Sequence, residues 1–339
     1  MTGGSIGSRT APTATDAPPK PMSPSERIDA IDVLRGLALF GVLAMNIVTI
    51  FRVSIFAQFL PNAEPAGPLD RAVAAVLTVA VDFKALALFS LLFGVGLAIQ
   101  FERLAKSERR TSLLLRRLVV LLAFGLIHLC LIWNGDILVE YALAGFVVLP
   151  FLGGPRWLMA GAALLLLGIY VTMPLLPPIV PLPGAAGMAA LVADATRAYG
   201  TGGFFDVLAF RIREVPAIFP LHVMVFPRTV ALFLVGAFAW RSGVVPRASA
   251  NRRLLFGVAT FGILLGGGGL NLAAAGQELF DWPSLGRARF PVERLGAVVL
   301  ALGYAAAVIA AVNLSGGRKM LAGPRRSAAW RSPTIWRNP

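Results

Sequence analysis

Long apolar stretches, separated by short polar segments, recur along this sequence. Each comes close to the roughly 20 residues that an α-helix needs to cross the hydrocarbon core of a bilayer. Only 14% of the residues are charged, whereas a soluble domain has about a quarter. The sequence therefore predicts an all-α fold, a polytopic transmembrane helix bundle. We expect about eight spans, at 36–56, 78–100, 114–134, 137–153, 157–176, 223–242, 253–275 and 292–314.

Basic residues predict how these spans are oriented, because cytoplasmic loops of membrane proteins carry an excess of Lys and Arg. The basic clusters fall between alternate pairs of spans, so all of them lie on one side if the N-terminus is cytoplasmic. The clusters are Arg27 and Arg35, then Arg103, Lys106, Arg109, Arg110, Arg116 and Arg117, then Arg156, then Arg241, Arg247, Arg252 and Arg253, and finally Arg318 and Lys319. The turn at 134–136 and the segment 177–222 then face outward.

Three parts of the chain differ in composition. Residues 1–26 are rich in Gly, Ser, Thr, Pro and Ala, which predicts a disordered N-terminal tail. Residues 27–314 form the transmembrane domain, and 315–339 are a basic tail. Within the domain, 177–222 starts with several prolines and is then too polar to span. We expect short helices there, lying in the outer interface or folded over a cavity.

The formal net charge of +14 does not indicate nucleic-acid binding, because the Lys and Arg residues lie in short segments between apolar runs. Such segments favour membrane lipids with anionic head groups as partners. Cys130 is the only cysteine, so the chain has no disulfide framework and no cysteine-based metal site, and we interpret it as a small buried hydrophobic residue. Two histidines are a weak metal signal, and we predict no metal.

The stretch 116–145 gathers the polar groups that are most costly in hydrocarbon. An apolar helix carrying His128 ends at a tight turn with Trp133 and Asp136, and a second apolar helix carries Glu140. Ionisable residues inside spans are candidates for function. An imidazole can act as acid, base or nucleophile near neutral pH, and the turn can pair His128 with Asp136 or Glu140. The alternative is a structural role for His128.

The first span offers a second group of candidates. Asp32 and Arg35 are one helical turn apart, so they can pair or jointly hold an anionic group at the cytoplasmic mouth of the span. The alternative is a salt-bridged helix start. Asn46 lies deeper in the same span, where its side-chain amide needs a hydrogen-bond partner. It either hydrogen-bonds to a neighbouring helix or forms part of a substrate site.

Small residues predict where helices approach closely. Ser90, Gly94 and Gly96 form a small-residue face, and the glycine run at 262–271 predicts tight packing or a local kink. The sequence holds no phosphate-binding loop, dinucleotide fingerprint or nucleophile elbow.

Three motifs, RIDAIDVLRGLALFGVLAMN at 27–46, FKALALFSLLFGVG at 83–96 and the whole stretch 116–145, also point to a family. In order and spacing they resemble the YeiB-like inner-membrane proteins, domain-of-unknown-function family 418. The match is strong over 27–150 and weaker beyond, where FLVGAFAWRSGVVP at 233–246 also fits. The resemblance implies a multi-pass protein of the bacterial cytoplasmic (inner) membrane.

The YeiB-like family is in turn similar to transmembrane acyltransferases, which carry D-x-L-R-G and then a His in the first span. This similarity implies acyl transfer from a cytoplasmic donor, such as acyl-coenzyme A, to a sugar or lipid acceptor. Asn46 stands where that His would fall, so His128 must take over as base or acyl carrier, with Asp136 beside it. Trp133 and Glu140 would join Asp32, Arg35 and Asn46 in binding substrates. The alternatives are a transporter for a small anionic or lipid-like solute and a non-functional truncated product; a homo-oligomer is compatible with any of these.

The C-terminal residues 315–339 depart from the family pattern. YeiB-like proteins continue after this point with G-R-M-A-L-T-N-Y-L-x-Q-S and further spans. A back-translation of 329–339 with suitably chosen third codon bases, read one frame over, gives Met-Ala-Leu-Thr-Asn-Tyr-Leu-Ala-Gln-Ser; the encoded residues fix the first two bases of most codons. We therefore predict that the reading frame is shifted near 315–328 and that the end of the fold is missing; the alternative is a naturally short basic tail.

Overall fold

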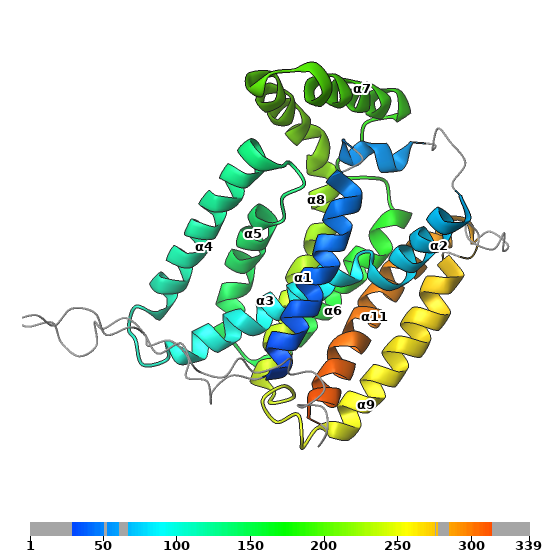
Figure 1. Ribbon diagram of the computed structural model, residues 1–339. Helices are drawn as coiled ribbons and strands as arrows, with labels where there is room; N and C mark the ends of the chain where they lie inside the picture. Colours follow the sequence, from blue (N-terminus) through cyan, green and yellow to red (C-terminus); the bar gives the residue numbers. More distant parts are fainter. Residues whose placement is uncertain (1–28, 51–52, 61–66, 275, 277–284, 314–339) are drawn as a thin grey trace, which may run out of the picture. The chain divides into compact units, whose positions relative to one another are not determined.

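The structure is a computed structural model that describes residues 29–50, 53–60, 67–274, 276 and 285–313. All regular elements in this part of the chain are helical (Figure 1). Seven helices are long and apolar enough to cross a membrane, and Leu138–Gly153 is a shorter apolar one. The prediction of an all-α bundle with about eight spans is therefore confirmed. The predictions for the tails 1–26 and 315–339 lie outside the described residues.

The helices overlap the predicted spans, but several of their ends differ: the first span lies earlier than the predicted 36–56, and the second begins ten residues before the predicted 78. The seven long helices run over Ala30–Val48, Pro68–Arg103, Arg110–Ile132, Arg156–Leu175, Phe204–Arg241, Arg252–Ala274 and Gly286–Val312. The largest difference is in the helix that we expected to begin at 223, which already begins at Phe204.

The chain divides into two compact units, which are described separately. Unit 1 contains Val48–Glu64 and Ser90–Ser242, and unit 2 contains Asp29–Ile47, Pro65–Phe89 and the residues from Gly243 on. The elements of unit 1 are η2 (Ile55–Phe59), the larger part of α3 (Lys84–Arg103), α4 (Arg110–Ile127), η4 (His128–Ile132), α5 (Leu138–Val148), η5 (Leu149–Gly153), α6 (Arg156–Thr172), η6 (Met173–Leu175), α7 (Ala185–Thr201) and α8 (Phe204–Arg241).

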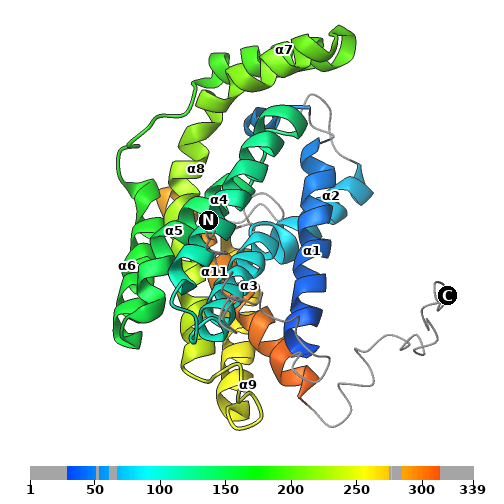
Figure 2. The same cartoon turned by 90° about the vertical axis from the view of Figure 1, so that its left-hand side faces the viewer.

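In unit 1, α4 and α5 form an antiparallel hairpin and α6 packs along α8 (Figures 1 and 2). Helices α3 and α8 cross with their backbones in contact. A Cβ on Gly94 would overlap the carbonyl oxygen of Phe233, and one on Gly236 would overlap that of Leu91. Glycine therefore permits this crossing. The predicted small-residue face holds for Gly94, whereas Gly96 faces open space.

The segment 177–222 differs from the expected set of short interfacial helices. It contains α7 and then the first half of α8, which continues without a break into the predicted sixth span. Prolines 216, 220 and 227 lie inside α8. Spanning helices tolerate proline where neighbouring groups satisfy the freed backbone. The polarity that suggested a loop comes partly from Glu214, which is buried in this helix.

Unit 2 is built mainly from apolar helices. Its elements are α1 (Asp29–Ile50), α2 (Pro68–Val76), η3 (Leu77–Val81), the start of α3, α9 (Arg252–Phe261), η7 (Gly262–Asn271), η8 (Gly286–Ala288) and α11 (Arg289–Val312). The glycine-rich η7 is π-helical and packs against α11 (Figure 1). A Cβ on Gly262 would lie 2.5 Å from Gly303 Cα, and one on Gly266 would lie 2.5 Å from Leu300 N. The predicted tight packing of this run is confirmed.

Candidate functional site

His128 and Asp136 face each other across the turn between α4 and α5. The α4 helix widens into the π-helical turn η4 at His128, a local irregularity that often marks functional positions. His128 Nδ1 lies 3.0 Å from Asp136 Oδ1, an ion-pair distance without the alignment of a hydrogen bond. The Asp136 side chain is 1% exposed and that of His128 is 32% exposed. The buried carboxylate can thus stabilise a positive charge on a ring that remains accessible.

Asp136 is held by the start of α5. Its Oδ2 accepts a hydrogen bond of 2.8 Å from the backbone N–H of Val139. This N–H is one of those that a helix start leaves without an intrahelical partner, and the positive end of the helix dipole favours a carboxylate there. The local sequence therefore fixes the carboxylate that faces His128.

A second histidine–carboxylate pair joins α5 to α8. His222 Nδ1 and Glu140 Oε2 form a hydrogen bond of 3.0 Å. The hydroxyl of Thr229 donates to the other Glu140 oxygen. His222 and Thr229 are seven residues apart, about two helical turns, so they project from the same side of α8. Glu140 is buried between them.

A third buried carboxylate, Glu214, lies near the start of α8. Its Oε1 accepts a hydrogen bond of 2.7 Å from the Ser54 hydroxyl, and its Oε2 accepts one from the Asn134 amide. Glu214 therefore joins three segments that are far apart in the sequence.

Further buried polar groups continue along the same helices. Tyr141 and Ser90 share a hydrogen bond of 2.7 Å between their hydroxyls. The Tyr141 ring packs edge-on against Phe93 and Phe233, at centroid distances of 5.4 and 5.1 Å. Arg228 is 2% exposed, and its guanidinium lies over the Tyr170 ring, 5.7 Å from the ring centroid.

We call these residues of unit 1 the polar seam. The polar seam consists of Ser54, Ser90, His128, Asn134, Asp136, Glu140, Tyr141, Glu214, His222, Arg228 and Thr229. Three of its members are buried carboxylates, and Arg228 is its one buried guanidinium.

The structure brings together part of the predicted site. The contact of His128 with Asp136 is present, and Glu140 pairs with His222 instead of His128. Trp133 is half-buried, with its ring over Gly135 in the same turn. The proposed roles of these residues remain predictions.

The other predicted site residues belong to unit 2. Asp32 and Arg35 form an exposed ion pair of 3.0 Å within α1, as their spacing predicted. Asn46 is half-buried on the same helix. Cys130, in unit 1, is half-buried and not fully buried as we expected.

Sequence reasoning missed His222, Glu214, Arg228, Thr229 and Ser54. Four of them lie on α8, at or after the point where the sequence suggested a polar loop. A signal was available, because Glu214, His222 and Thr229 are eight and seven residues apart, about two helical turns each.

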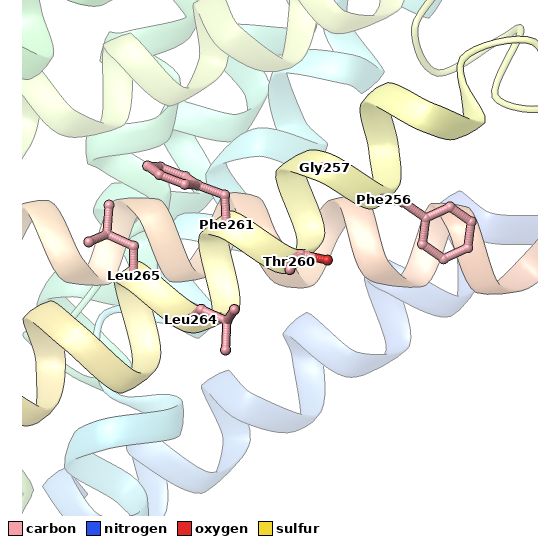
Figure 3. Close-up of a pocket in the computed structure, with 6 residues that line it drawn as sticks. All are labelled: Phe256, Gly257, Thr260, Phe261, Leu264 and Leu265. Atoms are coloured by element: carbon pink, nitrogen blue, oxygen red, sulfur yellow. The ribbon is translucent and has the colours of Figure 1, made fainter.

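The described residues hold no group of three or more His, Cys, Asp or Glu side chains that could bind a metal ion. An apolar hollow with a volume of about 740 Å³ lies on unit 2. Figure 3 shows that its lining comes from the continuous helical stretch of α9 and η7. Thr260 is the one hydroxyl among the six lining residues, so the hollow suits contact with lipid chains better than chemistry.

The fold and the polar seam define a multi-pass membrane protein whose buried ionisable groups are concentrated in one helical unit. The chain is 32% identical over 266 residues to the uncharacterised protein YxaH of Bacillus subtilis, and 37% identical over 123 residues to the uncharacterised protein YeiB of Escherichia coli. It therefore belongs to the family of these YeiB- and YxaH-like proteins.

The similarity covers only part of each relative. It spans 73% of this chain and 66% of YxaH, and 36% of this chain and 30% of YeiB. An uncharacterised 39.9 kDa protein of Bacillus acidopullulyticus is 35% identical over 39% of this chain and 36% of its own length. No protein-family model and no solved structure matches the chain.

Proposed function

We propose that this protein is a membrane acyltransferase in which His128 is the general base and Asp136 supports it. The contact between His128 Nδ1 and the buried Asp136 carboxylate is the observation that carries the proposal. It leaves the second ring nitrogen, Nε2, to accept a proton from a hydroxyl group of the acceptor. The carboxylate then stabilises the imidazolium that forms.

The reaction needs one donor, one acceptor and the base. The donor is an acyl thioester, such as acyl-coenzyme A, and the acceptor is a hydroxyl group of a sugar or lipid. As Nε2 takes the hydroxyl proton, the oxygen attacks the acyl carbon and forms an ester bond. The carbon–sulfur bond breaks, and the leaving thiolate takes the proton back from His128. Atoms and charge balance without a metal or an oxidant.

The resemblance to domain-of-unknown-function family 418, and through it to transmembrane acyltransferases, supports this proposal. In that resemblance Asp32 and Arg35 hold an anionic part of the donor. Asn46 takes the place of the acyltransferase histidine and, with Trp133 and Glu140, contacts substrates. We propose a cytoplasmic N-terminus, because all the basic clusters then lie on the cytoplasmic side of the membrane. We propose the bacterial inner membrane as the location, because the relatives are bacterial.

The test is transfer of a radiolabelled acyl group from acyl-coenzyme A in membranes that contain the protein. We expect labelled lipid or sugar product, and a loss of about 100-fold or more in His128→Ala. Asp194→Asn is the matched control, since this carboxylate is half-exposed on α7 and pairs only locally with Arg197. Full transfer activity in His128→Ala would remove the assignment.

A transporter is the second candidate, and one feature of α8 favours it. Three prolines interrupt the backbone hydrogen bonds of the helix that carries Glu214, His222 and Arg228. Buried ionisable groups inside membrane-spanning helices often mark substrate or ion pathways. Uptake of a small anion into proteoliposomes, together with no acyl transfer, would favour transport over the proposed enzyme.

A further inference from the structure

Glu214 differs from the other two carboxylates of the polar seam. Asp136 and Glu140 each lie 3.0 Å from an imidazole nitrogen, which can carry a compensating positive charge. Glu214 is 1% exposed, and the described residues that hydrogen-bond to it are the neutral side chains of Ser54 and Asn134. It is thus a deeply buried acid with two neutral partners.

The charged groups on Glu214's own helix have partners elsewhere. Arg211 donates to the carbonyl oxygen of Leu131 at 2.5 Å and to the Tyr199 hydroxyl at 3.1 Å. Arg213 bonds the carbonyl oxygen of Ala209 on its own helix.

The neighbouring elements bring the other titratable groups. Asp136, two residues after Asn134, is engaged by His128 and by the start of α5. On α7, Asp194 pairs with Arg197. On the segment before η2, the group that faces Glu214 is the hydroxyl of Ser54. Within the described chain, none of these groups places a cation on Glu214.

We propose that Glu214 is a proton-binding site. An ionised carboxylate that is removed from water without a compensating cation is very costly, and such a group binds a proton instead. A protonated carboxyl fits its surroundings, because one oxygen can donate to Ser54 Oγ while the other accepts from the Asn134 amide.

The surroundings suit a proton better than a metal cation. A cation such as Na⁺ or Ca²⁺ needs several oxygen ligands directed at one point. Asn134 presents its amide nitrogen to Glu214, and Ser54 Oγ already accepts a hydrogen bond of 3.2 Å from the backbone N–H of Phe56. The carboxyl group of Glu214 and its two hydrogen-bond partners, Ser54 and Asn134, therefore supply too few oxygen ligands for a metal cation but can accommodate a proton.

The bound proton would act on the turn that carries Asp136, the carboxylate beside the proposed base. Asn134 belongs to the same turn as Asp136, and Ser54 links Glu214 to the start of η2. Ionisation of Glu214 would leave a negative charge near Asp136 and would loosen this three-way junction. The proposal of a proton-binding site rests only on the contacts of Glu214 and does not depend on whether the protein transfers acyl groups.

The experiment is infrared difference spectroscopy of the purified full-length protein during a pH titration. We expect a carbonyl band of a buried, protonated carboxylic acid near neutral pH, and the loss of this band in Glu214→Gln. Asp194→Asn is the control and should keep the band. Ser54→Ala retains the acid and removes one hydrogen bond, so it should shift the band even if Glu214→Gln folds poorly.

A second measurement is thermal stability against pH. If the folded protein holds a proton that the unfolded chain releases, the melting temperature of the wild type falls as the pH rises above the range in which an ordinary glutamate ionises, about 4–5. Glu214→Gln cannot release that proton and should lose this part of the pH dependence. A wild-type band that survives in Glu214→Gln and is unmoved in Ser54→Ala would overturn the proposal. The titration is repeated with a sodium salt in place of a choline salt in the buffer. If the carbonyl band disappears in the sodium salt, Glu214 binds the cation in place of the proton, and the proposal of a proton site is overturned.

Discussion

Units 1 and 2 are both helical and apolar, but they hold their helices together in different ways. Of the ten buried polar or charged residues among those described, eight lie in unit 1, and Lys84 and Asn271 lie in unit 2. In unit 2, the close approach of glycines to the neighbouring helix dominates the packing of η7 on α11. The close contact of η7 with α11 therefore relies on glycines and not on paired ionisable groups. The cost of burying such groups in unit 1 needs another explanation, and function supplies one.

The largest expected loss of stability is at Glu140, and it distinguishes the polar seam from the rest of unit 1. Glu140→Ala removes the partner of both His222 and Thr229, so we expect it to lower the free energy of unfolding by about 3–5 kcal/mol. Thermal unfolding in detergent measures the loss. Asp194→Ala, in a half-exposed pair on α7, should cost less than about 1 kcal/mol. Equal effects would show that the seam does not differ energetically from the surface.

The next effect tests the glycine packing of unit 2. In Gly262→Ala the new Cβ would lie 2.5 Å from Gly303 Cα, so α11 must move, at a cost of about 1–3 kcal/mol. Gly268→Ala is the matched control, because a Cβ there meets nothing within 4 Å in the same η7. The melting temperature should fall for Gly262→Ala alone. A stable Gly262→Ala variant would remove the contrast between the two units.

A smaller effect is expected at the edge of the seam. Ser90→Ala removes one hydroxyl partner of the buried Tyr141, and we expect a loss of about 1 kcal/mol. Tyr199→Phe removes a more exposed hydroxyl that accepts from Arg211, and should cost less. Chemical unfolding of the two variants side by side distinguishes them, and the reverse order would contradict the assignment of Tyr141 to the seam.

The smallest effect is expected in α1. Asp32 and Arg35 form an exposed pair one helical turn apart, so Asp32→Asn should change stability by no more than about 0.5 kcal/mol. If the pair holds an anionic donor, Arg35→Ala should raise the apparent KM for that donor while stability is unchanged. An unchanged KM would leave the pair as a helix-start ion pair.

The sequence predicts most of the fold, because hydropathy and length alone define a spanning helix. It also predicts the pairing of Asp32 with Arg35 and of His128 with Asp136, whose partners are three and eight residues apart. Local geometry determines such pairs.

The rest of the seam could not be predicted in this way. Glu140 and His222 are 82 residues apart, and Asn134 and Glu214 are 80 residues apart. Their pairing depends on how α5 and α8 pack. The polar residues in the first half of α8 also hid the helix, since polarity normally indicates a loop, whereas Glu214 is buried inside the helix.

The most direct test of the central claim is a double-mutant cycle on the rate of acyl transfer. Asp136→Asn keeps an oxygen for the Val139 N–H but removes the charge that faces His128. We predict that Asp136→Asn lowers the rate strongly, that His128→Ala lowers it by about 100-fold or more, and that the double variant is no slower than His128→Ala. Rate losses that multiply in the double variant, or an unchanged rate in Asp136→Asn, would contradict the claim that the two residues act as one unit.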